Sequence, residues 1–66
     1  SDVVREAFSH RRKTLSNCLK GLSSIYGKEK TVEFLASLPK DLLQKRPEVL
    51  SVAEFIELSN SFAARL

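Results

Sequence analysis

The feature that most constrains this chain is a helical spacing of apolar residues that recurs along almost its whole length. Leu15, Cys18, Leu19 and Leu22 follow the i, i+3, i+4, i+7 pattern, which places them on one face of a helix. No segment alternates apolar and polar residues over the length of a strand. The chain has 66 residues, enough for one domain, and ten of them are leucines. The sequence therefore predicts an all-α fold, a small single-domain bundle of about four short helices.

The predicted helices cover residues 2–11, 14–24, 28–37 and a segment that begins at residue 51. Thr14 is expected to cap the start of the second helix. Pro39 ends the third, because proline disfavours helix in the residue before it. Residues 42–43 are expected to form a further short turn. Ser51 and Glu54 have the spacing of a capping box, which is the clearest helix start in the chain.

Each predicted helix has an expected inward face. In the first helix this face consists of Val3, Val4, Ala7 and Phe8, and in the second of Leu15, Cys18, Leu19 and Leu22. In the third it consists of Val32, Phe34, Leu35 and Leu38, and in the last of Phe55, Leu58, Phe62 and Leu66. Tyr26 is expected to be the only aromatic ring at the surface. Gly21 lies inside the second helix, where glycine either permits close helix contact or weakens the helix. Cys18 is the only cysteine, so we expect a small core residue in a reducing compartment.

Positive charge is concentrated in the first half of the chain. Residues 7–28 contain no Asp or Glu but five Lys and Arg, whereas residues 34–66 contain four basic and four acidic residues. The formal net charge of +3 is therefore local. A local basic face implies an anionic partner, and nucleic acid is the first candidate.

The candidates for contact with phosphate lie at the junction of the first two helices and along the polar side of the second. They are Arg11, Arg12, Lys13, Asn17 and Lys20. Arginine binds phosphate with a two-pronged fork and lysine acts as a point charge. Asn17 offers a neutral hydrogen bond to a phosphate, a sugar hydroxyl or a base edge. Two alternatives stay open: a solvated surface, or arginines that bind the carbonyl groups at a helix C-terminus.

Catalytic and metal-binding residues are not expected in this chain. His10 has no nucleophile or carboxylate at a suitable spacing, and it forms no metal cluster with Cys18. Gly21 and Gly27 are the only glycines, too few for a phosphate loop. We therefore expect no enzyme activity from the chain by itself. It contains neither an apolar run of roughly 18–20 residues nor a signal peptide, so we expect a cytoplasmic protein that makes no membrane contact.

Two segments resemble motifs of a known family. Residues 8–19 read F-S-H-R-R-K-T-L-S-N-C-L and resemble the signature F-x-x-R-R-K-T-L-x-N-x-L of bacterial small-subunit ribosomal RNA adenine dimethyltransferases, with eight matching positions. Residues 46–51, R-P-E-V-L-S, followed by Phe55, are similar to the family's second C-terminal motif. The resemblance implies that residues 1–66 are the C-terminal helical domain of such an enzyme, excised from a longer chain.

The resemblance also implies a function. The parent enzymes use S-adenosylmethionine to dimethylate two adjacent adenines near the 3′ end of 16S ribosomal RNA during assembly of the small subunit. Their Rossmann-like N-terminal domain carries the cofactor loop and the catalytic motif, which these residues lack. The C-terminal domain helps to dock the enzyme on the pre-30S subunit. The basic candidates would then face RNA, whereas Phe8, Thr14 and Leu15 would pack against the N-terminal catalytic domain.

Three hypotheses remain for the chain. The leading one is an RNA-docking domain of such a methyltransferase. The second is a structural or protein-interaction domain that packs on the catalytic domain without binding RNA. The third is an unrelated small helical module that binds DNA. In each case we expect a monomer, because no second long apolar stripe is left exposed.

Overall fold

The computed structural model describes residues 2–10 and 12–66. This part of the chain contains six α-helices, two 3₁₀ turns and no strand. In chain order the elements are α1 (Asp2–Ser9), α2 (Leu15–Leu19), η1 (Lys20–Leu22), α3 (Ser23–Tyr26), α4 (Lys28–Ala36), α5 (Lys40–Leu43), η2 (Pro47–Val49) and α6 (Val52–Ala63). The all-α fold predicted from the sequence is confirmed.

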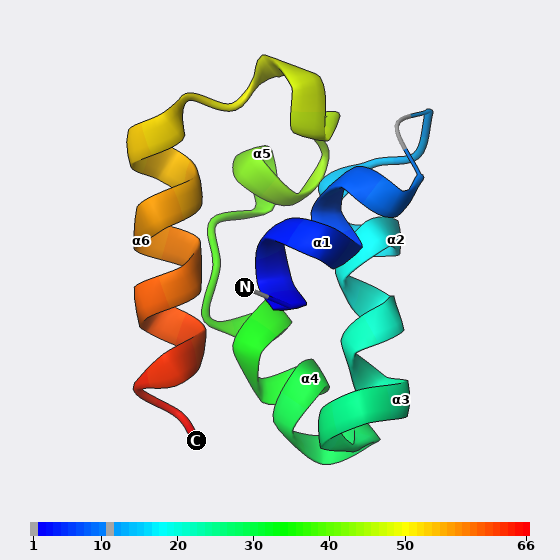
Figure 1. The fold of residues 1–66 in the computed structure, drawn as a ribbon, viewed down its shortest axis with the longest axis vertical. Helices are drawn as coiled ribbons and strands as arrows, with labels where there is room; N and C mark the ends of the chain where they lie inside the picture. Colours follow the sequence, from blue (N-terminus) through cyan, green and yellow to red (C-terminus); the bar gives the residue numbers. More distant parts are fainter. Residues whose placement is uncertain (1, 11) are drawn as a thin grey trace.

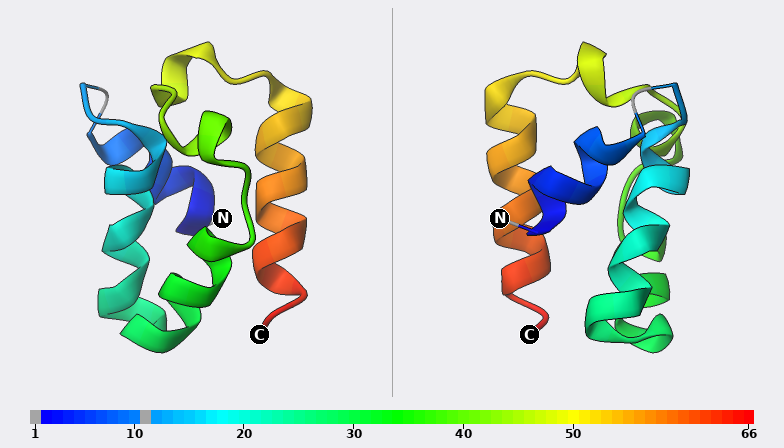
Figure 2. Two further views of the ribbon diagram at one scale, coloured as in Figure 1. Left: turned by 180° about the vertical axis from the view of Figure 1, so that it is seen from behind. Right: turned by 45° about the vertical axis from the view of Figure 1, so that its right-hand side comes forward.

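The four predicted helices correspond to α1, a composite rod, α4 and α6. The rod consists of α2, η1 and α3, which follow one another without a break. Figure 1 shows the rod on one side of the molecule and α6 on the other, with α1 crossing between them. The views in Figure 2 agree, and α1 contacts both α2 and α6. The predicted short turn is α5.

The core joins all of these helices around aromatic rings. Phe34 of α4 has no exposed surface, and its ring centroid lies 4.9 Å from that of Phe62 on α6. The rings of Phe62 and Tyr26 also pack edge to face, with 4.8 Å between their centroids. The expected leucine face of the rod is fully buried against them. These helices are therefore held together mainly by the burial of large apolar side chains.

Three apolar residues that we expected in the core are exposed instead: Phe8, Val32 and Leu66 are 43%, 53% and 59% exposed. On α1, Val3 and Ala7 turn inward and leave Phe8 at the edge of the core.

The inward side of α4 is formed by Thr31 and Phe34, which lie three residues apart, and Val32 is rotated away by about 100° per residue. Thr31 was missed because it is polar, but its hydroxyl donates to the carbonyl oxygen of Gly27 at 2.9 Å and so has a partner.

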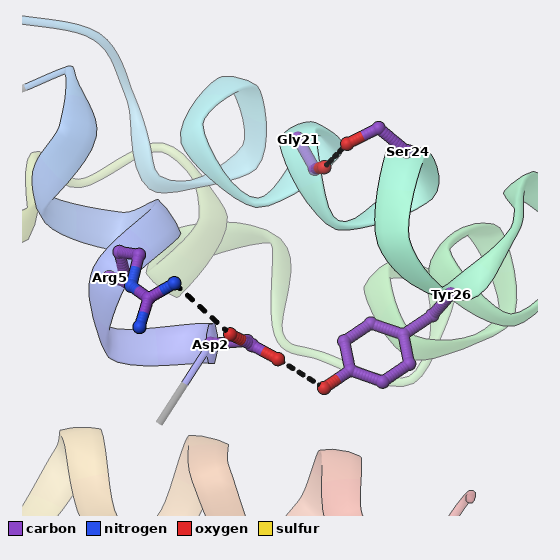
Figure 3. A network of polar contacts seen from close by, with 5 residues as sticks. All are labelled: Asp2, Arg5, Gly21, Ser24 and Tyr26. Atoms are coloured by element: carbon purple, nitrogen blue, oxygen red, sulfur yellow. Dashed lines mark hydrogen bonds and ion pairs between the residues drawn. The ribbon is translucent and has the colours of Figure 1, made fainter.

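Tyr26 is also placed differently from the prediction. Its hydroxyl donates to the carboxylate of Asp2, which in turn pairs with Arg5 at 3.7 Å (Figure 3). This hydrogen bond to Asp2 raises the pKa of Tyr26 above its ordinary value. The expectation of an exposed tyrosine ring was therefore wrong, because the ring is half-buried and ties α3 to the start of α1.

The two glycines are expected to respond oppositely to alanine. A Cβ on Gly21 would meet only the carboxylate end of Glu6, a flexible group that can move aside. We expect Gly21→Ala to stabilise the chain by about 0.5 kcal/mol, because alanine is the better helix former. Gly27 has φ of +94°, where a side chain is strained, so Gly27→Ala should cost about 1–3 kcal/mol. Thermal melts of both variants test this, and a loss of stability in Gly21→Ala would show instead that the helices need glycine there.

The capping box at the start of α6 is present as predicted. The amide of Glu54 donates to the Ser51 hydroxyl oxygen at 3.1 Å, and the Ser51 amide donates to the Glu54 carboxylate at 2.9 Å. Ser51→Ala removes one acceptor for the free amides of the first turn. We expect a loss of about 1 kcal/mol in the free energy of unfolding, measured by urea titration.

The same contact makes stability depend on pH. The hydrogen bond from the Ser51 amide lowers the pKa of Glu54, against a smaller opposing effect of burial. A lowered pKa stabilises the folded state above the ordinary glutamate pKa, and the contribution is lost as the pH falls through the folded value. On acidification, the unmutated chain should therefore lose more of its free energy of unfolding than the Glu54→Ala variant does. Equal losses in both proteins would contradict the assignment.

Candidate nucleic-acid interface

The turn between α1 and α2 is held in place from inside the domain. The amide of Lys13 donates to the carbonyl oxygen of His10 at 3.0 Å, which closes the turn. The Thr14 hydroxyl accepts from the amide of Asn17 at 3.4 Å and caps α2, as predicted. From the core side, the thiol of Cys18 donates to the same His10 carbonyl at 3.1 Å. These bonds anchor the backbone at His10, Lys13 and Thr14, while the side chains of His10, Arg12 and Lys13 are exposed.

Cys18 acts here as a buried anchor. It is 1% exposed, and burial raises the pKa of its thiol, partly offset by the hydrogen bond to His10. A thiol with a raised pKa is a poor nucleophile because little of it is ionised. The interpretation of Cys18 as a small core residue agrees with this environment.

The predicted contact residues that the structure describes are all exposed: Arg12, Lys13, Asn17 and Lys20. The fifth, Arg11, lies outside the described residues. Asn17 and Lys20 are one turn apart on the rod, and the Lys20 ammonium donates to the Asn17 side-chain oxygen at 3.3 Å. Lys13 lies two residues before the start of α2, and Lys20 directly follows its end. The basic residues therefore run from the turn along the outer side of the rod.

The cations of this surface are not held in ion pairs within the described part of the chain. Among the described residues, no carboxylate forms an ion pair with Arg12, Lys13 or Lys20. No hydrogen bond ties Arg12 to a carbonyl of α1 within the described part either. Furthermore, α2 has no acidic residue in its first turn, and cations are unfavourable near a helix N-terminus. A bound anion would offset the unfavourable interaction between the cations at the start of α2 and the positive end of that helix.

The structure adds a residue that sequence reasoning missed. The amide of Leu15 donates to the carbonyl oxygen of Lys45 at 2.7 Å, which brings the loop before η2 against the start of α2. Arg46 follows directly, is exposed, and forms no ion pair with a described residue. The two sequence motifs thus meet in space. Only the occurrence of Arg46 within the second motif could have signalled this, because helix periodicity does not predict loop contacts.

Two kinds of site receive no support in the described part of the chain. Residues 2–10 and 12–66 bring together no group of three or more His, Cys, Asp or Glu side chains that could hold a metal ion. In the same residues no helix has the length and apolar character to cross a membrane.

The fold and the basic turn together define a small all-helical domain with an uncompensated cationic edge. Curated relatives identify the family more closely. The chain is 40% identical over 63 residues to a probable ribosomal RNA small subunit methyltransferase A of Methanospirillum hungatei, with 96% of this chain and 25% of the relative covered. It is 47% identical over 64 residues to the ribosomal RNA small subunit methyltransferase A of Phocaeicola vulgatus, with 97% and 20% covered.

A third relative, from Vibrio cholerae and of the same name, is 45% identical over 58 residues, with 88% of this chain and 18% of the relative covered. The chain belongs to the ribosomal RNA small subunit methyltransferase A family. It spans only 18–25% of the length of these relatives. No protein-family model matches the chain, and no solved structure does.

Proposed function

We propose that this chain is the RNA-docking domain of a small-subunit ribosomal RNA methyltransferase. In this proposal residues 1–66 form the C-terminal domain of an enzyme that dimethylates two adjacent adenosines near the 3′ end of 16S ribosomal RNA. The domain binds the RNA of the pre-30S subunit and so orients the catalytic domain. The protein then works in the cytoplasm during ribosome biogenesis.

The observation that carries the proposal is the uncompensated charge of Arg12, Lys13 and Lys20. A folded domain gains nothing from the unpaired cations Arg12 and Lys13 beside the N-terminus of α2, whereas a phosphate backbone pairs with them and releases its counterions. The relatives' names state that they act on ribosomal RNA of the small subunit. Arg46 is added to the predicted contact residues because its loop is fixed against α2.

The chemistry of methyl transfer is assigned to the rest of the full-length enzyme. S-adenosylmethionine supplies the methyl group there. The described residues offer no glycine loop for that cofactor, since Gly21 lies in a helical turn against Glu6 and Gly27 joins two helices. Neither glycine begins a loop that could surround a nucleotide-like group. The role of this domain is therefore binding and orientation.

The test is a binding titration of the chain against a single-stranded 3′-terminal fragment of 16S ribosomal RNA across a salt series. Each phosphate contact on a single strand contributes roughly 0.7 to the slope of log K against log salt. With three or four contacts we expect a slope of about −2 to −3. Duplex DNA serves as the competitor. Tighter binding to the duplex would favour a DNA-binding module, and a flat salt series would leave the domain without an RNA contact.

A second candidate function is favoured by one further observation. Several large apolar side chains outside the basic edge are exposed, among them Phe8, Val52 and Ile56. Such side chains suit a role in packing on the catalytic domain. This role is compatible with RNA docking because the two surfaces are different.

A further inference from the structure

A cleft lies between α5 and α6, and its lining combines apolar and acidic side chains. Its volume is about 460 Å³. Figure 1 shows α5 beside the first turns of α6, and Figure 2 shows the same arrangement from behind. The apolar part of the lining consists of Leu38, Pro39, Leu42 and Leu58. This α5–α6 cleft is therefore open enough to receive side chains of a partner.

The carboxylates of the cleft lie at its rim. Asp41, Glu54 and Glu57 line it, and Lys45 is the one cation that the described residues contribute. Asp41 and Glu57 are exposed whereas Leu58 is buried, so the acids stand above an apolar floor. No described cation forms an ion pair with any of the three carboxylates. The cleft is thus locally negative in a chain whose formal net charge is +3.

The arrangement of these charges limits what the cleft can bind. A phosphate backbone is repelled by it, in contrast to the turn between α1 and α2. In residues 2–10 and 12–66, no three His, Cys, Asp or Glu side chains come close enough together to hold a metal ion. The rim carboxylates are therefore spread out, and they match a ligand whose cations are spaced along its length.

Lysine and arginine side chains match both the rim and the floor. Their aliphatic stems lie along apolar surfaces while their charged heads stay at the water boundary. In the α5–α6 cleft the stems would contact Leu42 and Leu58, and the heads would reach Asp41 and Glu57. Arginine adds geometric specificity because its guanidinium group binds a carboxylate through two parallel hydrogen bonds.

We propose that the α5–α6 cleft binds an extended, arginine- or lysine-rich segment of a partner protein. The choice of partner rests on the proposed function, because basic protein arms accompany nucleic acids in the particles on which such an enzyme would act. The volume of the cleft lies in the lower part of the roughly 300–1,000 Å³ range of ligand pockets, which suits a few side chains better than a folded domain.

The two charged surfaces of the domain then select different partners. The turn with Arg12 and Lys13 attracts phosphate and repels a basic peptide, whereas the α5–α6 cleft does the reverse. Opposite charges on separate surfaces suppress binding in the wrong place, because like charges brought together are unfavourable. The domain would thereby contact the RNA and a protein of one particle in a fixed orientation.

The test is a fluorescence-anisotropy titration of the chain with a labelled synthetic peptide in which arginines alternate with glycines. A peptide of about six residues spans roughly 20 Å when extended. Its arginines then lie on one face, because side chains alternate along an extended chain. Both ends are blocked so that only the arginines carry charge.

The double variant Asp41→Asn, Glu57→Gln should bind this peptide about tenfold more weakly, because it removes two exposed ion pairs of up to about 1 kcal/mol each. Its Tm should stay nearly unchanged, since both side chains are exposed. Glu29→Gln, Glu33→Gln is the matched control. Both residues are exposed on α4 outside the cleft, and Glu29, like Asp41, lies in the first turn of its helix. The control should lose less than about twofold, through long-range attraction alone.

Four outcomes would overturn the inference. Equal losses in the two double variants would mean that the peptide responds only to overall charge. Displacement of the peptide by an equal concentration of spermidine, which carries as many charges, would make a polyamine the ligand. Absence of peptide binding in the full-length methyltransferase would show that the rest of the polypeptide covers the cleft. Self-association of the chain that Asp41→Asn, Glu57→Gln dissociates in sedimentation would make a second copy the occupant.

RNA binding by the same variants is measured alongside. We expect Asp41→Asn, Glu57→Gln to bind the single-stranded 16S fragment at least as tightly as the unmutated chain, because the variant loses negative charge. Intact RNA binding without peptide binding would overturn this inference alone and leave the RNA-docking proposal standing.

Discussion

Replacing Phe34 by alanine is expected to lower the Tm of this chain by about 15–30 °C. Phe34 has no exposed surface and its ring contacts that of Phe62 at 4.9 Å, so the variant leaves a cavity where the helices meet. Truncation of a buried phenylalanine costs about 3–5 kcal/mol. Each kcal/mol lowers Tm by about 4–8 °C in a domain of this size. A chain of 66 residues has only about 3–10 kcal/mol of stability in total, so much of the variant will be unfolded.

Val32→Ala is the matched control for this prediction. Val32 lies on the same helix, two residues before Phe34, but is 53% exposed. Its truncation should change the free energy of unfolding by no more than about 0.5 kcal/mol. Thermal melts followed by circular dichroism measure both variants. Similar losses in both would mean that α4 is rotated relative to the fold described above.

The helices could be predicted from the sequence because their signals are local. The i, i+3, i+4, i+7 spacing of Leu15 and its neighbours predicted the rod, and the Ser51 capping box marked the start of α6 within a residue. The faces of the shorter helices could not be predicted as well. In α4, both Val32 and Phe34 are apolar, and only packing against α6 decides which of them is buried.

In the candidate interface, too, local features could be predicted from the sequence, whereas contacts between distant segments could not. The basic run was visible because Arg12 and Lys13 are neighbours in the sequence and no acid lies near them. The approach of Arg46 was not, because it depends on a backbone hydrogen bond between Leu15 and Lys45, thirty positions apart. The exposed position of Phe8 was hidden for a related reason. Phe8 belongs to a helical stripe, and the sequence does not say that it lies at the edge of the core with its ring stacked on Phe55.

Replacing Arg12, Lys13 and Lys20 together by alanine is expected to weaken binding to the single-stranded 16S fragment roughly 50-fold at 0.15 M salt. Three phosphate contacts contribute about 2 to the slope of log K against log salt. Between 1 M salt, where counterion release no longer favours binding, and 0.15 M salt, a slope of about 2 corresponds to roughly 50-fold in the binding constant. The slope itself should fall by about 2. The fold should survive, because all three side chains are exposed and pair with no carboxylate among the described residues.

The control must remove the same charge from another part of the surface. Lys28, Lys30 and Arg65 are exposed. The start of α4 and the end of the chain lie far from the turn between α1 and α2 (Figure 1). Alanine at these three positions lowers the net charge equally, so any loss of binding common to both triple variants reports long-range attraction. A much larger loss in Arg12, Lys13 and Lys20 would locate the phosphate contacts at the turn. Equal losses would mean that the chain attracts RNA only through its overall charge, and the proposed docking surface would then be wrong.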